Sequence, residues 1–453
     1  MATLHHQPEA VEQYGIEAIP AALRSVGWFD LFSIFINFLI NPGDIIRAGL
    51  AVAAGLSVPM AILAQVLGTL LAIIFYVAMA NVGVDYGLPG QVAARMSFGV
   101  RGAKLLSSLL RLVVSIYYFA FQTIIGATAI AAVFDQIFHI KTPLLTLSIV
   151  FGVLQAVVAL AGYDSLKKLS RFALPVKLVV LGYLAYVLVT NPDTNFAPAR
   201  VLHYVGPSGF SWLLLFTWLN ASTATWLSMT TDSADFCRYS SNRLQMWIGV
   251  LIAAVFGTLI TGAFGAYATA AALGRDSNAF TVIANAHPTT LTLAAILLVI
   301  ALNNWTINVL NIYTGGLSLN NMWGKLGRFW STLVVSILSV ALCLAPNLLT
   351  GFLGYVNVIG NFFAPISGIL VFDYILTRRC KVDVPALYRH EGPYWYLGGF
   401  NPVAAAWLAI GFLLYMYAIP EMWLRPFLTA VITGAGYSLT YAAVFRSGPA
   451  TQV

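Results

Sequence analysis

The sequence predicts an all-α integral membrane protein of about twelve transmembrane helices, and three observations lead to this fold class. First, 60% of the 453 residues are hydrophobic and only 9% are charged, which is too little charge to cover a soluble surface. Second, apolar stretches long enough to cross a bilayer recur along the whole chain. Third, polar residues inside the membrane gather in a few of these stretches, at a regular spacing.

The apolar stretches define the expected helices in order. They begin near Trp28, Leu56, Leu106, Leu144, Phe172, Phe210, Met246, Leu291, Phe329, Leu353, Pro402 and Met422. Short connections follow the first and the ninth stretch, so a count of about eleven helices stays open.

The positions of Lys and Arg predict the orientation in a cytoplasmic (inner) or plasma membrane. With both termini in the cytoplasm, most of these residues fall in cytoplasmic connections, as the positive-inside rule requires. The outer side receives only Arg47, Lys141, Arg200, Arg275 and Arg425. The net charge of +7 then faces the anionic lipid of the bilayer, so no nucleic-acid partner is needed. The three scattered cysteines indicate neither disulfides nor a metal cluster, and we expect no cofactor.

The first stretch reads FINFLINPGD and predicts a broken helix. Asn37 and Asn41 lie four residues apart, on one helical face, and Pro42-Gly43 follows directly. Proline removes a backbone donor and glycine permits almost any backbone conformation. We therefore expect backbone carbonyls without helical partners before the break and Asp44 just after it.

The sixth stretch, NASTATWLSMTTD, is rich in small and hydroxyl residues. This composition has weak helix propensity, which predicts a second helix with an unwound middle. Its one large side chain is Trp226, with Thr225 beside it and Asp232 at its end.

The third and eighth stretches are polar in the middle. In the third, Gln122 follows Tyr118 by four residues, so the two share a face. The eighth contains NNWTINVLN, in which the stripe of Asn304, Asn308 and Asn311 lies beside Asn303 and Thr306. Such residues often only join neighbouring helices. Their gathering in several helices favours a polar cavity instead.

The two breakable stretches are five apart, and so are the two polar ones. This spacing predicts a five-helix repeat that occurs twice with inverted topology, followed by two extra helices. Transporters of this plan bind solute and ion at mid-membrane, between broken helices. The expected divisions are a cytoplasmic tail over 1–23, repeats over 24–190 and 209–376, a cytoplasmic loop over 377–401, two helices over 402–446 and a tail over 447–453.

Several motifs resemble those of the nucleobase–cation symporter family, which includes cytosine, purine, allantoin and hydantoin permeases. They are RSVGWFDLF at 24–32, VAARMSFGVRGAK at 92–104, YYFAFQT at 117–123, DFCRY at 235–239, DYILTRR at 373–379 and LYRHEGPYWYLGGFNPVA at 387–404. The resemblance implies the leucine-transporter fold, with the five-plus-five inverted repeat and two C-terminal helices. It also implies alternating access around a mid-membrane site.

The resemblance also implies a solute site in which a flat ring stacks between aromatic side chains and bonds to amides. The matching residues are Trp226 with its neighbour Thr225, Gln122, Asn41, and Tyr118 where the family has a tryptophan. The family's asparagine on the eighth helix falls at Ile312, so Asn311 or Asn308 must serve. An amide matches the donor and acceptor edge of a neutral nucleobase, so the pocket for such a neutral solute needs no charged residue.

The implied cation site consists of the carbonyls of Asn37, Ile40 and Asn303 with the hydroxyl of Thr306. Sodium is the favoured coupling ion, although Ile307 stands where sodium-coupled members have a second hydroxyl. The alternative is a proton, for which Asp44 and Asp232 are the candidate acids. We expect Asn304 to brace the broken first helix.

Other functions stay open. They are a carrier of a vitamin or amino acid, or a passive facilitator. The sequence contains no HExxH, Walker or GxSxG motif, so we do not expect an enzyme. The expected partners are a small heterocyclic solute, a cation and the lipid bilayer, and we expect a monomer.

Overall fold

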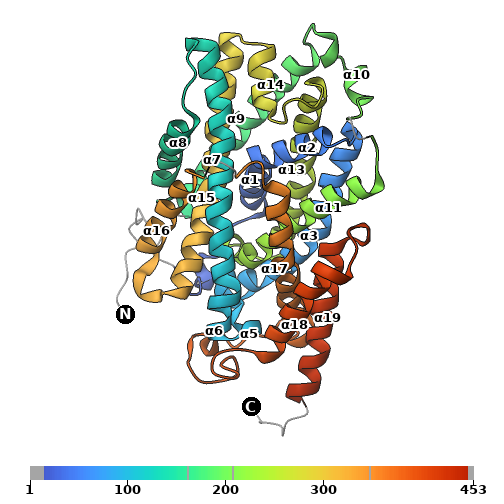
Figure 1. Cartoon of the computed structure of the whole chain (residues 1–453). Helices are drawn as coiled ribbons and strands as arrows, with labels where there is room; N and C mark the ends of the chain where they lie inside the picture. The colour runs from blue at the N-terminus through green and yellow to red at the C-terminus, as the bar shows by residue number, and fades with distance from the viewer. Residues whose placement is uncertain (1–14, 161–162, 207–208, 346–347, 447–453) are drawn as a thin grey trace, which may run out of the picture.

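The computed structural model describes residues 15–160, 163–206, 209–345 and 348–446 (Figure 1). Within these ranges the chain is almost entirely helical and forms only two isolated β-bridges. The predicted tail at 447–453 and residues 1–14 of the predicted tail at 1–23 lie outside the described residues.

The long helices follow the predicted stretches in order. They are α1 (Trp28–Leu39), α2 (Pro42–Ala53), α3 (Val58–Tyr86), α7 (Leu109–Phe138), α8 (Leu144–Ala159), α9 (Tyr163–Val189), α11 (Trp212–Leu227), α13 (Arg243–Ala271), α15 (Thr290–Met322), α16 (Gly327–Leu342), α17 (Phe352–Phe372), α18 (Pro402–Leu413) and α19 (Arg425–Arg446). Short helices connect them: α4 (Gly90–Ala93), α5 (Arg95–Phe98), α6 (Val100–Ala103), α10 (Pro198–Leu202), α12 (Ser233–Cys237) and α14 (Ala279–Ala286). Among the described residues, 8 helices are long and apolar enough to span a membrane, and the bent pair α1/α2 makes a ninth.

The first transmembrane helix is broken as predicted. The axes of α1 and α2 differ by 47°, and Pro42 occupies the first turn of α2, where a missing backbone donor costs nothing. The Asn41 side chain caps α2 by accepting a hydrogen bond from the Asp44 amide at 2.9 Å. Gly43 permits a close approach, because a Cβ there would lie 2.5 Å from the Gln122 side chain.

The sixth transmembrane helix changes form in its middle. The α-helical α11 ends at Leu227, a 3₁₀ segment spans Ser228–Asp232, and α12 continues the path. Hydroxyl side chains bond back to the local backbone here, as Ser228 does to the Thr225 carbonyl, which weakens the α-helix. The predicted unwinding therefore takes the form of a tighter helical segment.

The helix packing follows an inverted repeat. The first helix packs along the seventh (α1 on α13), and the sixth packs along the second (α11 on α3). In a five-plus-five repeat, helices one and two correspond to helices six and seven. The contact between helices one and seven therefore corresponds to the contact between helices six and two. The third and eighth helices, α7 and α15, pack along each other. Figure 1 shows α1 and α2 near the middle of the bundle and α18 and α19 beside α17 at its edge.

Candidate functional site

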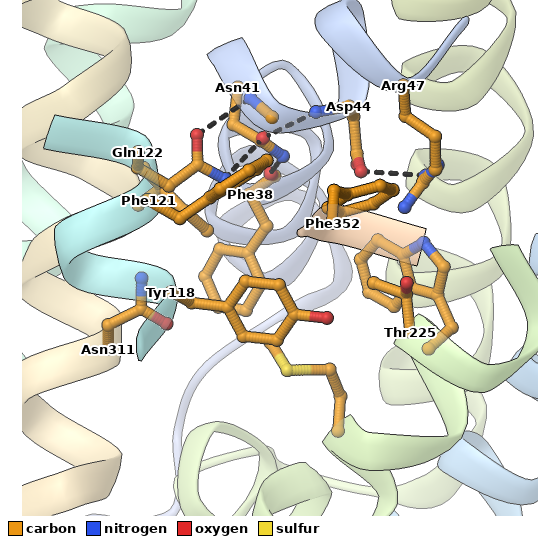
Figure 2. Close-up of a pocket in the computed structure, with 14 residues that line it drawn as sticks. Phe38, Asn41, Asp44, Arg47, Tyr118, Phe121, Gln122, Thr225, Asn311 and Phe352 are labelled. Atoms are coloured by element: carbon orange, nitrogen blue, oxygen red, sulfur yellow. Dashed lines mark hydrogen bonds and ion pairs between the residues drawn. The ribbon is translucent and has the colours of Figure 1, made fainter. Parts of the chain in front are cut away.

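A cavity lies between the two interrupted helices and is walled by α7, α15 and α17 (Figure 2). Six of the predicted solute residues line it: Trp226, Thr225, Gln122, Tyr118, Asn41 and Asn311. Chain segments that are far apart in the sequence thus meet around one space, as the inverted repeat predicts.

Asn308 is the predicted solute residue that lies elsewhere. Its amide donates to Thr123 Oγ1 at 3.0 Å and to Gln155 Oε1 at 2.6 Å, so it joins α15 to α7 and α8. Asn311 lines the cavity and donates to Asn308 Oδ1 at 3.1 Å. Of the two alternatives, the structure therefore places Asn311 at the cavity and Asn308 behind it.

Gln122 lies in the cavity wall, and its amide is bonded to the broken helix. Its Oε1 accepts from the Gly43 backbone amide at 2.7 Å, and its Nε2 donates to Asn41 Oδ1 at 2.8 Å. Figure 2 shows the two amide side chains turned toward each other. A primary amide has a second donor hydrogen and a second acceptor lone pair, so each atom keeps one position for a further partner.

Aromatic rings form much of the remaining wall. Phe121 and Phe352 stack with centroids 5.2 Å apart, which links α7 to α17. Phe38 contributes from α1. The Tyr118 hydroxyl and the Trp226 indole nitrogen are buried and have no hydrogen-bond partner among the described residues. Buried donors without partners are unusual, so a cavity that holds two of them is suited to a ring with polar edges.

The cavity also contains charge, which a neutral solute does not need. Asp44 and Arg47 line it from α2 and form an ion pair at 2.7 Å. The distribution of Lys and Arg predicts that Arg47 lies in an outer connection. Its side chain is instead buried, because the residue is only 2% exposed. The spacing of three residues places both on one face of α2, and this spacing next to the break was the signal that sequence reasoning missed.

The other candidate acid, Asp232, lies outside the residues that line the cavity. It pairs with Arg111 of α7 at 3.0 Å, and both side chains are fully buried. Arg111 also donates to Thr314 Oγ1 at 3.2 Å and to the sulfur of Met229 at 3.1 Å. Since Met229 lines the cavity, this ion pair lies directly behind the cavity wall.

Three of the four predicted cation-ligand residues, Asn37, Ile40 and Thr306, meet around a lysine to which the sequence gave no role. Lys177 of α9 is fully buried. Its Nζ donates to Asn37 Oδ1 and Thr306 Oγ1, both at 2.9 Å, and to the Ile40 carbonyl at 3.1 Å. The Asn37 carbonyl lies 3.4 Å away. An ionisable residue within an apolar membrane helix is itself a functional signal, and it could have drawn attention to Lys177.

Three further residues of α15, Asn303, Asn304 and Ile307, lie beside these groups. The Asn303 carbonyl accepts from Thr306 Oγ1 at 3.0 Å, and the Asn303 amide is buried without a partner among the described residues. The Asn304 amide donates to the Ile300 carbonyl of its own helix at 3.2 Å and lies against Gly126 of α7. Ile307, expected next to the cation, lines the cavity. The sequence thus predicted that α15 has a polar face, but not which of its residues face the cavity and which face α7.

Comparisons with known proteins agree with this architecture. Residues 18–441 match the family described as "Permease for cytosine/purines, uracil, thiamine, allantoin". The chain is 26% identical to a hydantoin permease of Microbacterium maritypicum, in an alignment that covers 88% of this chain and 83% of that protein. It is 26% identical to a purine-uracil permease of Arabidopsis thaliana, over 86% and 68% of the two chains. It is 28% identical to the cytosine permease of Escherichia coli K12, over 73% and 74%.

Solved structures share the fold. Mhp1, a nucleobase-cation-symport-1 family transporter in a closed conformation with bromovinylhydantoin bound, matches with a TM-score of 0.82 and 21% identity. The match covers 97% of this chain and 96% of that one. A Na⁺-coupled sialic acid symporter matches with a TM-score of 0.63 and 12% identity, over 96% and 93% of the two chains.

Proposed function

Because the chain belongs to the family of permeases for cytosine/purines, uracil, thiamine and allantoin, we propose that it is a secondary active transporter that imports a flat, nitrogen-rich heterocycle. The chain is a multi-pass membrane permease and not an enzyme. The solute class, the coupling to a cation, alternating access and the cytoplasmic position of both termini are parts of this proposal.

One observation carries the choice of solute: the cavity combines aromatic walls with amide groups at a helix break. Trp226 and Tyr118 provide ring faces, and stacking of a base on a protein aromatic contributes about 1–3 kcal/mol. Gln122, Asn41 and Asn311 provide donors and acceptors for the ring edge. A solute that lacks the matching edge would leave these buried groups unpaired, which is the basis of strong rejection.

The Asp44–Arg47 pair refines this expectation. An exocyclic carbonyl of a heterocycle would accept a hydrogen bond from the Arg47 guanidinium. A ring N–H would donate to Asp44 Oδ2, which has no hydrogen-bond partner among the described residues, while Oδ1 remains paired with Arg47. The cavity therefore favours oxo-substituted rings, such as uracil, oxopurines, allantoin and hydantoins, over purely hydrocarbon-substituted ones. Of the two candidate coupling acids, Asp44 is the one that lines the solute cavity.

The test is a thermal-shift screen of the purified protein against nucleobases, allantoin, hydantoins and thiamine, followed by uptake of each hit into proteoliposomes. A ligand that binds only the folded state raises the melting temperature according to its occupancy. We expect at least one oxo-substituted ring to stabilise the wild type and not a Trp226→Ala variant. If no ring of this class stabilised the protein, or if amino acids did so instead, the proposed solute class would be wrong.

A further inference from the structure

We propose that the ammonium group of Lys177 is a built-in cation that takes the place of a bound sodium ion, so that solute binding by this chain does not require sodium. The inference deepens the proposed function. The second test below, which uses a bound solute, rests on that function. Its central observation is that oxygen atoms from two helices converge on one nitrogen atom supplied by a third.

The oxygen atoms have the chemistry of a cation site. Two side-chain oxygens, from Asn37 and Thr306, and the Ile40 carbonyl surround Lys177 Nζ at 2.9–3.1 Å. All of them are neutral oxygen acceptors, which are the ligands that hard cations prefer. Ile40 is the last residue before the break, so the peptide dipoles of α1 direct their negative end toward the ammonium.

Lys177 reaches this position because α9 is joined to α1 beside it. The Asn37 amide donates to the Ser170 carbonyl of α9 at 2.9 Å while its oxygen accepts from Lys177 at 2.9 Å. Thr306 donates its hydroxyl hydrogen to α15 carbonyls and accepts the ammonium with its oxygen. The ammonium therefore ties α9, α1 and α15 together at the helix break.

In the part of the chain that the structure describes, α1, α14 and α15 are the main helices packed against α9, and the hydrogen bonds of Lys177 go to neutral oxygens. The only charged residue of α1 is Asp30, and its carboxylate pairs with Arg171 at 2.5 Å. Neither α14 nor α15 contains an Asp, Glu, Lys or Arg. The ammonium is thus held by neutral oxygens alone, as a sodium ion would be.

Sodium and this ammonium cannot use the site together. A sodium ion would need the same oxygens at a shorter distance, and the nitrogen already lies among them. Two positive charges a few ångströms apart also repel strongly in a poorly hydrated interior. The expected sodium cage of Asn37, Ile40, Asn303 and Thr306 is therefore not a fit for sodium while Lys177 is present.

The first test needs no solute. The melting temperature of the purified protein is measured in sodium chloride and in choline chloride at equal ionic strength. We expect the wild type to be indifferent to sodium. Lys177→Ala removes the ammonium and leaves the oxygens, so sodium should raise its melting temperature selectively. Lys325→Ala changes an exposed lysine of a short connection and should behave like the wild type.

Either of two results would overturn the inference. One is a sodium-specific stabilisation of the wild type. The other is a folded Lys177→Ala variant that ignores sodium, which would reduce Lys177 to a packing residue. If Lys177→Ala did not fold, the wild-type measurement would still decide, and Lys177→Met, which keeps most of the bulk, would replace it in the comparison.

The second test uses the heterocycle identified by the screen. Its affinity for the wild type should change less than two-fold between sodium and choline, whereas Lys177→Ala should bind at least ten-fold tighter in sodium. Reciprocity requires that the solute then tighten sodium binding by the same factor. If no heterocycle bound at all, the proposed solute class would be wrong. The first test, which needs no solute, would still decide whether Lys177 replaces sodium.

Discussion

Gln122 and Asn41 are joined by a 2.8 Å hydrogen bond across the break of the first helix. The same Gln122 side chain accepts the Gly43 amide, so one residue of α7 holds both sides of the break in register. Gln122 therefore belongs both to the cavity wall and to the contacts that hold the break of the first helix. A solute that bonds to Gln122 is expected to affect the position of α2 as well.

We predict that Gln122→Leu weakens solute binding by at least ten-fold. The change keeps a similar bulk but removes the donor and the acceptor, and a lost hydrogen bond at a desolvated site costs about 1–3 kcal/mol. Isothermal titration of the solute measures the effect. Gln136→Leu, on the same helix and bonded to Asn285 near its end, is the matched control and should bind normally. Equal binding by both variants would remove Gln122 from the solute site.

We predict that Trp226→Ala abolishes specific uptake, whereas Trp226→Phe retains part of it. The indole lines the cavity and is 4% exposed, so alanine removes the stacking face and phenylalanine preserves a smaller one. Uptake into proteoliposomes and the amount of folded protein are measured together. Trp212→Ala is the control, because this residue begins the same helix and is 60% exposed. Unchanged solute affinity in Trp226→Ala would contradict the assignment.

We predict opposite effects for the two asparagines of α15. Asn311→Ala should weaken solute binding and leave the melting temperature near that of the wild type, because Asn311 lines the cavity. Asn308→Ala leaves Gln155 Oε1 and Thr123 without their buried donor, so it should destabilise the protein by about 1–3 kcal/mol. Thermal unfolding and solute titration on both variants separate the roles. A solute-specific defect confined to Asn308→Ala would reverse the assignment.

We predict that Asp232→Asn is strongly destabilising. The change leaves Arg111 as a buried charge without its carboxylate, and breaking a buried ion pair in this way costs about 3–5 kcal/mol. The double variant Asp232→Asn/Arg111→Met should recover part of the loss, because neither charge then remains. Melting temperatures of the single and double variants measure the coupling. A stable Asp232→Asn protein with altered coupling to protons would instead favour Asp232 as the coupling acid.

The sequence by itself determined which segments cross the membrane and where two of them are interrupted. These features are local: Pro42-Gly43 cannot continue a regular helix, and the hydroxyl-rich stretch before Asp232 favours bonds to its own backbone. The spacing of polar helices also predicted the inverted repeat, because each helix must bury its polar face against a partner. Six of the predicted solute residues consequently line one cavity.

The tertiary structure alone decided which side chains meet. Lys177 is separated from Asn37 by 140 positions and from Thr306 by 129, and no local pattern relates helices five, one and eight. Helical periodicity identifies the polar face of α15, but the rotation of the packed helix decides that Asn311 reaches the cavity and Asn308 reaches Gln155. The position of Lys177 in the interior depends likewise on neighbouring helices, because a charge enters the membrane only where it finds partners, and α1 and α15 supply them.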